Sequence, residues 1–194
     1  MVMKKLLILD MDETLLHTEC FRDIDYLEEG SYDFKFPLGG GGWSNDEHWY
    51  FTIKRPFLDE FMNYAFDNFK VAIWTAGGSD YASEAISRAG IDKNKLEFFW
   101  SRERCTMKYD FESGFSYGVK NLEKVHKSLG FDLNDVLIVD DVQRTAINNY
   151  GNLIHIKEFY NDRSDTELEK LMNYLDKIKD SSNFRSIEKR GWSN

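Results

Sequence analysis

The chain has 194 residues, and its 42% hydrophobic and 15% aromatic content suits one well-packed domain and excludes a disordered chain. Its 34 acidic and 25 basic residues give a formal charge of −9, which disfavours DNA or RNA as the main partner because phosphate backbones bind clustered Lys and Arg. Two cysteines are too few for a disulfide scaffold, and the N-terminal apolar run is too short for a signal peptide or a membrane span. We therefore expect a cytoplasmic protein, or a nuclear one if its source is eukaryotic, with no membrane partner.

Short apolar runs recur along the chain and predict strands. The first, KKLLILD, ends at Asp10, and similar runs cover residues 71–76 and 136–141. Continuous apolar runs of this length are typical of strands that are buried on both faces, and such strands belong to parallel sheets. Residues 96–100 and 153–156 are weaker strand candidates.

Between these runs, four segments have the apolar spacing of amphipathic helices. The first covers residues 55–69 and has Pro56 at an early position, where proline is favoured. The second and third, residues 79–89 and 119–129, each end at a glycine, and the fourth begins at Ser164 in a capping box. Strands that alternate with helices predict an α/β fold with a mainly parallel central sheet, in which ligands bind at the carboxyl ends of the strands.

Residues 18–54 depart from this alternation. Residues 32–36 alternate with period two, residues 48–53 form a second strand-like run, and the glycines at 39–42 begin the turn between them. We interpret the segment as a β-hairpin inserted after the first strand, beside the mouth of the site. The whole chain, residues 1–194, is expected to form a single domain that contains this insert.

Polar residues stand where the predicted strands end or a helix begins, and they carry the candidate chemistry: Asp10, Asp12, Thr14, Thr75, Lys120, Asp140 and Asp141. The first three spell DxDxT, with both carboxylates on the same side of an extended chain. The last two are adjacent carboxylates, which repel each other and need a cation or a proton. Each feature alone is ordinary, because acidic residues often end strands, threonine is a good strand residue and lysines are common on surfaces. Their order along one α/β chain indicates a site.

Together with the surrounding strings, this order resembles the haloacid dehalogenase (HAD) superfamily of phosphotransferases. The resemblance is greatest to the branch of phosphatases that act on the C-terminal domain (CTD) of RNA polymerase II and their small relatives. It covers residues 4–175 and rests on the strings DMDETLLHT, KRPFLDEF, IWTAGGSDYA, SRERC, YGVKNL, VLIVDD and SDTELEKL. It implies a Rossmann-like HAD fold without a large cap, and a Mg²⁺-dependent phosphatase that works through an aspartyl-phosphate.

The resemblance also implies the roles of the acidic residues. Asp10 is the nucleophile that attacks phosphorus, and Asp12 protonates the leaving oxygen and then takes a proton from water. Magnesium is bound by the Asp10 carboxylate, the Asp12 backbone carbonyl and the Asp141 side chain. Asp140 contacts the magnesium through an ordered water, or it supports the residues that bind the ion without binding it itself.

Two further residues are expected to contact phosphate, and a third is a candidate. Thr75 and Lys120 hold the phosphate oxygens that take no part in bond making or breaking. Arg102, in the string SRERC, either contacts the phosphate or forms a surface salt bridge. Two positions depart from the branch, with Asp141 where Asn is usual and Gly77 where a polar residue is common. The second departure, with the dissimilar insert, leaves the substrate open.

The leading hypothesis is a phosphoserine/phosphothreonine protein phosphatase, whose partner is a phosphorylated protein or peptide. The alternatives within the enzyme class are a phosphatase of a polynucleotide end or of a small phosphometabolite. The acidic stretch near the insert argues against the first, and the lack of room for a closing cap argues against the second. A non-catalytic scaffold that binds a phospho-ligand is less favoured, because every residue of the catalytic pattern is present.

Overall fold

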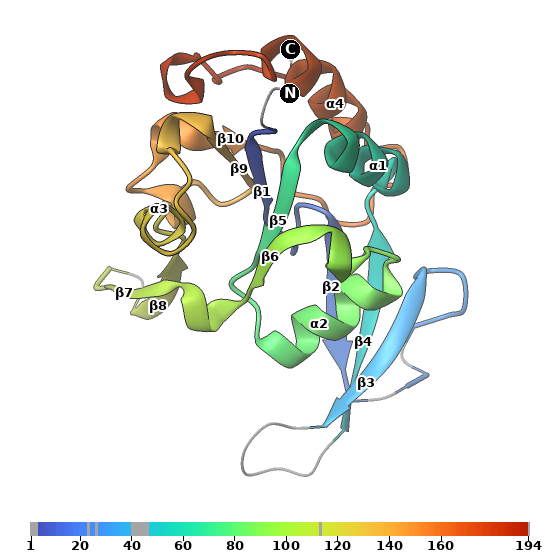
Figure 1. The fold of residues 1–194 in the computed structure, drawn as a ribbon. Coiled ribbons are helices and arrows are strands. Elements are labelled where there is room, and N and C mark those ends of the chain that lie inside the picture. Colours follow the sequence, from blue (N-terminus) through green and yellow to red (C-terminus); the bar gives the residue numbers. More distant parts are fainter. Residues whose placement is uncertain (1–3, 23, 26, 40–46, 113, 194) are drawn as a thin grey trace.

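A computed structural model describes residues 4–22, 24–25, 27–39, 47–112 and 114–193 of the chain. Its central sheet has five strands in the order β10-β9-β1-β5-β6, and every neighbouring pair is parallel (Figure 1). These strands are β1 (Leu6–Leu9), β5 (Lys70–Trp74), β6 (Leu96–Trp100), β9 (Val136–Asp140) and β10 (Leu153–His155). All five lie at the predicted apolar runs, and the predicted α/β fold with a parallel central sheet is confirmed.

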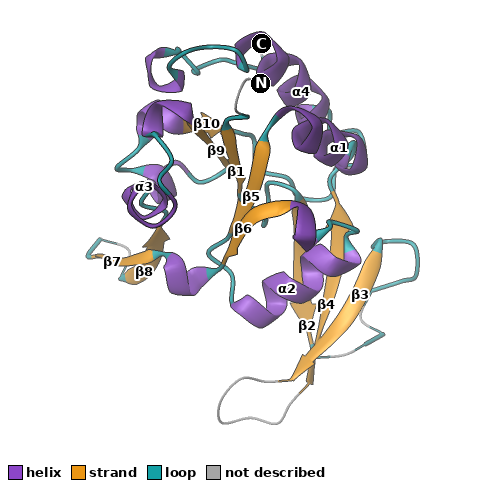
Figure 2. Cartoon of the chain, viewed as in Figure 1, coloured by secondary structure: helices purple, strands orange, loops and turns teal. Residues whose placement is uncertain are grey.

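Helices cover both faces of the sheet (Figure 2). They are α1 (Leu58–Asn68), α2 (Ser79–Arg88), α3 (Glu123–Leu129) and α4 (Glu167–Ile178). Successive residues of a strand point to opposite faces of the sheet. Leu7 and Leu9 of β1 therefore pack in one core cluster with residues of α1, α2 and α4. Leu6 and Ile8 pack on the other face, in a second cluster with residues of α3. This burial on both sides accounts for the continuous apolar character of β1.

The predicted starts of the first and fourth helices are wrong. Pro56 lies in a turn before α1, and Phe57 has a left-handed backbone with φ of 65°, so α1 begins only at Leu58. Ser164 does not begin α4 either. Asp165 accepts the N–H of Glu167 at 2.9 Å and so satisfies a donor at the start of that helix, which a short acidic side chain does well.

The segment 18–54 forms part of a second, antiparallel sheet beside α2 (Figure 1). Its strands are β2 (Leu16–Phe21), β3 (Phe34–Gly39) and β4 (Glu47–Lys54), in the order β2-β4-β3. The predicted pairing of the two insert strands is thus observed as β3 with β4, and β2 is a third strand that the sequence did not indicate. The turn between β3 and β4, which includes Trp43, lies outside the described residues.

A two-stranded hairpin, β7 (Thr106–Asp110) and β8 (Phe115–Val119), was not predicted. The predicted start of the third helix at residue 119 is also wrong: Val119 ends β8 and the helix begins at Glu123, so Lys120 precedes the helix. The described residues also form six short 3₁₀ helices: Lys93–Lys95, Arg102–Arg104, Leu133–Asp135, Gln143–Ala146, Tyr150–Asn152 and Phe184–Ser186. Over the residues that the structure describes, no helix has the length and apolar character to cross a membrane.

Candidate active site

The carboxyl ends of β1 and β9 lie next to each other and bring three of the predicted acidic residues together. Asp10 follows β1 directly, and its N–H donates to the carbonyl of Val139 in β9 at 2.9 Å. Asp140 is the last residue of β9, and both carboxylates are buried. One carboxylate oxygen from each of Asp10, Asp140 and Asp141 lies within 4.8 Å of the other two. We call these three residues the acidic cluster.

Lys120 is the cation that contacts the acidic cluster. Its side chain is buried, and its Nζ donates to Asp10 Oδ1 and, at 2.8 Å, to Asp140 Oδ2. Its position between β8 and α3 is fixed by a backbone hydrogen bond to the carbonyl of Thr145 at 2.8 Å. Burial lowers the pKa of Lys120, but the charges of Asp10 and Asp140 outweigh burial and raise the pKa above its ordinary value. Lys120 therefore stays charged at neutral pH.

Asp140 uses its carboxylate to hold other residues in place. Besides Lys120, its Oδ2 accepts from Thr145 Oγ1 at 2.6 Å, and its Oδ1 accepts from the N–H of Val142 at 2.9 Å. Both oxygens are thus hydrogen-bonded to protein donors. Such a carboxylate fits a place behind a metal site better than a place among the direct ligands.

The acidic cluster has more negative charge than Lys120 offsets. Burial raises the pKa of Asp10 well above its ordinary value, and the charges of Asp140 and Asp12 add to this against the opposing effect of Lys120. Burial and Asp140 likewise raise the pKa of Asp141. Carboxylate oxygens are the ligands that Mg²⁺ prefers, and a divalent cation would remove this electrostatic conflict. The residues present therefore fit a magnesium site.

Asp12 does not belong to the acidic cluster but lines a neighbouring pocket. Its Oδ2 accepts from Thr75 Oγ1 at 3.0 Å, and its Oδ1 accepts from the hydroxyl of Tyr81 at 2.5 Å. Thr75 follows β5 and is itself fixed by the N–H of Gly77, which donates to Thr75 Oγ1 at 2.8 Å. Burial raises the pKa of Asp12, while the bonds from Tyr81 and Thr75 oppose the shift. A carboxyl group with a raised pKa is suited to donating a proton near neutral pH.

The sequence reasoning missed two residues that support the site. Tyr81 of α2 contacts Asp12, as described above. Arg55 is fully buried, donates to both carboxylate oxygens of Asp165 at 2.9 Å, and donates to the backbone carbonyl of Thr14 at 3.0 Å. Thr14 Oγ1 in turn lies 3.4 Å from an oxygen of Asp10, so Arg55 acts on the loop that contains the DxDxT motif. The only signal for either residue was its presence in one of the strings that carry the resemblance.

The pocket that Asp12 lines has a volume of about 730 Å³ and is lined by residues of β2 and β4, of α2 and of the loop after β5. Tyr50 of β4 lines one part of it and Arg102 another. The Nε of Arg102 donates to the carbonyl of Ala76 at 2.8 Å, and in the described part of the chain its guanidinium forms no ion pair. The structure therefore places Arg102 at the pocket and not in the alternative salt bridge.

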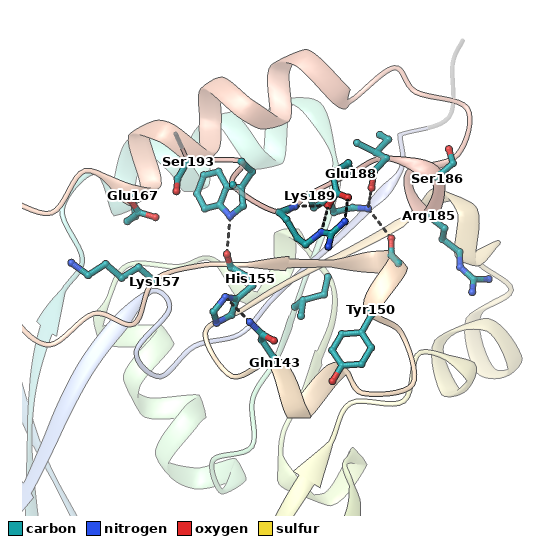
Figure 3. Close-up of a pocket in the computed structure, with 16 residues that line it drawn as sticks. Gln143, Tyr150, His155, Lys157, Glu167, Arg185, Ser186, Glu188, Lys189 and Ser193 are labelled. Carbon is teal, nitrogen blue, oxygen red and sulfur yellow. Dashed lines mark hydrogen bonds and ion pairs between the residues drawn. The ribbon is translucent and has the colours of Figure 1, made fainter.

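A larger cavity, of about 940 Å³, lies between β10 and the C-terminal residues 185–193 (Figure 3). One side is closed by Lys189, whose ammonium group donates to the backbone carbonyls of Gly151, Phe184 and Ile187. None of the predicted site residues lines this cavity. The smaller pocket, which Asp12 and Arg102 line, and the adjoining acidic cluster together form the candidate active site.

Comparison with known proteins agrees with the geometry. The model of the NLI interacting factor-like phosphatase family matches residues 5–185. The chain is 33% identical over 193 residues to CTD phosphatase-like protein 355R of Invertebrate iridescent virus 3, a match that covers 91% of this chain and 97% of that protein. It is 29% identical over 199 residues to CTD nuclear envelope phosphatase 1 of Xenopus laevis, covering 97% of this chain and 73% of that protein.

A solved structure also has this fold. The structure of Fcp1, an essential RNA polymerase II CTD phosphatase, superposes with a TM-score of 0.67 at 17% identity. The match covers 91% of this chain, and this chain spans 62% of the Fcp1 chain. The family match and the sequence relatives agree with the resemblance that the motifs indicated. The chain belongs to the NLI interacting factor-like phosphatase family and is a phosphatase of the HAD type.

Proposed function

We propose that the chain is a magnesium-dependent phosphomonoester hydrolase that forms an aspartyl-phosphate on Asp10 and acts on phosphoserine or phosphothreonine in proteins. One observation carries the proposal: Asp10, Lys120 and Asp141 converge at one edge of the sheet, beside the pocket that Asp12 lines. A buried nucleophile, a cation, a metal-binding carboxylate and a separate proton donor are the groups that this chemistry needs. Residues 1–194 act as one catalytic domain in this proposal.

The two carboxylates of the DxDxT motif divide the chemistry between them. In the first step an Asp10 oxygen attacks phosphorus, the bond to the leaving oxygen breaks, and Asp12 gives that oxygen its proton. In the second step water attacks phosphorus, Asp12 takes a proton from the water, and the bond to Asp10 breaks to release inorganic phosphate. The structure supports this division because Asp10 is paired with Lys120, whereas Asp12 accepts from the neutral hydroxyls of Thr75 and Tyr81 and has a pKa raised by burial.

Three residues would hold the phosphoryl oxygens. The ammonium of Lys120 contacts Asp10 and is therefore within reach of a phosphoryl group on that residue. Thr75 contacts Asp12, so it lies where the leaving oxygen and the phosphoryl group meet. Arg102 lines the pocket beside Asp12 and offers a guanidinium group, whose planar donors match phosphate oxygens. These donors would stabilise the negative charge of the transition state.

Asp10, Asp141 and the backbone carbonyl of Asp12 would bind Mg²⁺, with Asp140 behind them. When bound, the ion supplies positive charge that offsets the repulsion between the phosphate and the carboxylates. The hydrogen bonds of Asp140 to Lys120 and Thr145 suit this supporting place, because they fix the cation that faces the nucleophile.

A phosphorylated segment of a protein is the substrate class that the pocket suits best. The pocket is bordered by Tyr50 of the insert and by Arg102, and the described residues form no cap domain over it. An open pocket of this kind admits a side chain that is attached to a polypeptide. The formal charge of −9 disfavours a polynucleotide, and Fcp1 is named as a phosphatase of a protein segment.

A substrate panel tests the proposal. The purified chain with Mg²⁺ would be assayed against phosphoserine and phosphothreonine peptides, a 5′-phosphorylated oligonucleotide and common sugar phosphates. We expect the highest kcat/KM on peptides, and no turnover by a folded Asp10→Asn variant. A preference for the oligonucleotide or a sugar phosphate would overturn the substrate class but not the chemistry. Tight binding of phosphopeptides without turnover of any ester would instead identify a phospho-ligand scaffold.

A further inference from the structure

The carboxyl group of Asp12 is held at both oxygens by neutral donors. Thr75 Oγ1 donates to Oδ2 at 3.0 Å, and the Tyr81 hydroxyl donates to Oδ1 at 2.5 Å. Two donors on different oxygens fix the rotation of a carboxyl group, which otherwise turns freely about its last bond. Thr75 is already expected to contact phosphate, but Tyr81 has no assigned role.

Packing fixes the Tyr81 ring, so its hydroxyl is held in one place. Its ring lies 5.2 Å from the ring of Tyr50 in β4 and 6.2 Å from that of Phe36 in β3. On the other side the backbone is close: a Cβ added to Gly77 would lie 3.2 Å from Tyr81 Cδ1 and 3.3 Å from Asp12 Oδ2. The ring contacts therefore hold the hydroxyl at the position from which it donates to Asp12 Oδ1.

We propose that Tyr81 is a positioning residue for general acid catalysis, which it promotes by orienting the carboxyl group of Asp12 toward the leaving oxygen. The inference rests on the proposed function and adds a residue to it. When Asp12 is protonated, Tyr81 still donates to Oδ1 and the proton is carried on Oδ2, where the rotatable Thr75 hydroxyl accepts from it instead of donating. In the first step this proton moves to the leaving oxygen while the P–O bond to that oxygen breaks and the bond to Asp10 forms.

The role of Tyr81 can be tested by varying how much the leaving group depends on protonation. A serine side chain leaves as a strongly basic alkoxide unless it is protonated, so its phosphate ester needs a well-placed acid. A p-nitrophenolate ion is a stable leaving group and needs little protonation. A change that only misorients Asp12 should therefore slow the cleavage of alkyl phosphates much more than that of p-nitrophenyl phosphate. A general loss of structure would slow both equally.

The test compares Tyr81→Phe with the wild type on a phosphoserine peptide and on p-nitrophenyl phosphate, both with Mg²⁺. The readout is kcat/KM, because it reports the step in which the leaving group departs. We expect a fall of about 30-fold on the peptide, a part of the 10²–10⁴ that general acid–base catalysis contributes, and a change of less than about threefold on the aryl ester. Equal losses on the two substrates, or no loss on either, would overturn the inference.

Two controls separate this result from other causes. Tyr64→Phe removes a phenolic hydroxyl from α1, none of whose residues lines the pocket, and should leave both kcat/KM values unchanged. A crystal structure of Tyr81→Phe should show the Asp12 side chain in a different or divided rotamer, and an unchanged Asp12 would contradict the inference even if activity fell. If the wild type turns over neither ester, the proposed function fails and this inference fails with it. If the wild type is active and the ratio does not change, only the inference fails.

Discussion

The buried ion pair between Arg55 and Asp165 gives the sharpest prediction about stability. The two side chains are 0% and 6% exposed, and they meet through two hydrogen bonds of 2.9 Å each. The same guanidinium donates to the carbonyls of Thr14 and Lys157 at 3.0 and 2.8 Å and lies over the ring of Phe159. Asp165 therefore neutralises a cation that joins the DxDxT loop to the start of α4.

Removing Asp165 should be costly because it leaves the guanidinium buried without a counter-charge. Loss of one member of a buried pair costs about 3–5 kcal/mol, a large part of the 5–15 kcal/mol that is typical of whole domains. We expect about 3 kcal/mol for Asp165→Asn, in which the side-chain carbonyl can still accept from the N–H of Glu167. Asp165→Ala also removes the acceptor of the Glu167 N–H and should cost about 1 kcal/mol more.

Urea unfolding followed by circular dichroism measures these losses, provided that the slope with denaturant is unchanged. The matched control is Arg163→Ala, which breaks the pair of Arg163 with Asp33, whose side chains are 50% and 30% exposed. That surface pair should contribute less than about 1 kcal/mol. A loss of the same small size for Asp165→Asn would refute the argument that burial of Arg55 makes its partner essential.

Two further predictions concern the metal and the insert. EDTA should abolish turnover and Mg²⁺ should restore it, because the acidic cluster otherwise presents excess negative charge to phosphate; full activity in metal-free buffer would contradict this. The insert, residues 18–54, should govern substrate choice. Phe36 and Phe51 of the insert are buried, so deletion of the insert would remove part of the core, and a point substitution is the better test. Tyr50→Ala should weaken kcat/KM on a preferred phosphoserine peptide while that on a phosphoserine peptide with unrelated flanking residues stays within about tenfold. Both substrates have the same leaving group, so equal losses would show that the insert supports the active site itself.

The central strands were predictable because burial alone determines which residues they contain. Strands β1 and β9 are buried on both faces, so every residue is apolar until the strand ends at an aspartate. The same pattern placed the candidate residues at one edge of the sheet. The hairpin of β7 and β8 has no such pattern, since Tyr109 and Phe115 are 53% and 74% exposed. Because the sequence does not indicate this hairpin, Val119 is wrongly included in the apolar spacing of the following helix.

The supporting residues could not be read from the sequence, because their contacts are distant along the chain. Arg55 is separated by 110 residues from Asp165, and without that partner an arginine before a helix indicates only a surface cation. Tyr81 lies 69 residues from Asp12, and its place on α2 is equally typical of a core aromatic residue. Long-range contacts of this kind depend on how the helices pack on the sheet, which local patterns do not determine.

The identity of the phosphorylated residue tests the central claim most directly. The enzyme with Mg²⁺ would be mixed rapidly with excess phosphopeptide, quenched in acid within milliseconds, and treated with borohydride, which reduces an acyl phosphate to an alcohol. Peptide mass spectrometry then locates the reduced side chain. We predict that it lies at Asp10, that it appears only with substrate and Mg²⁺, and that Asp10→Asn shows neither the modification nor turnover. Modification of any other residue in the active enzyme would contradict the assignment of Asp10 as the nucleophile.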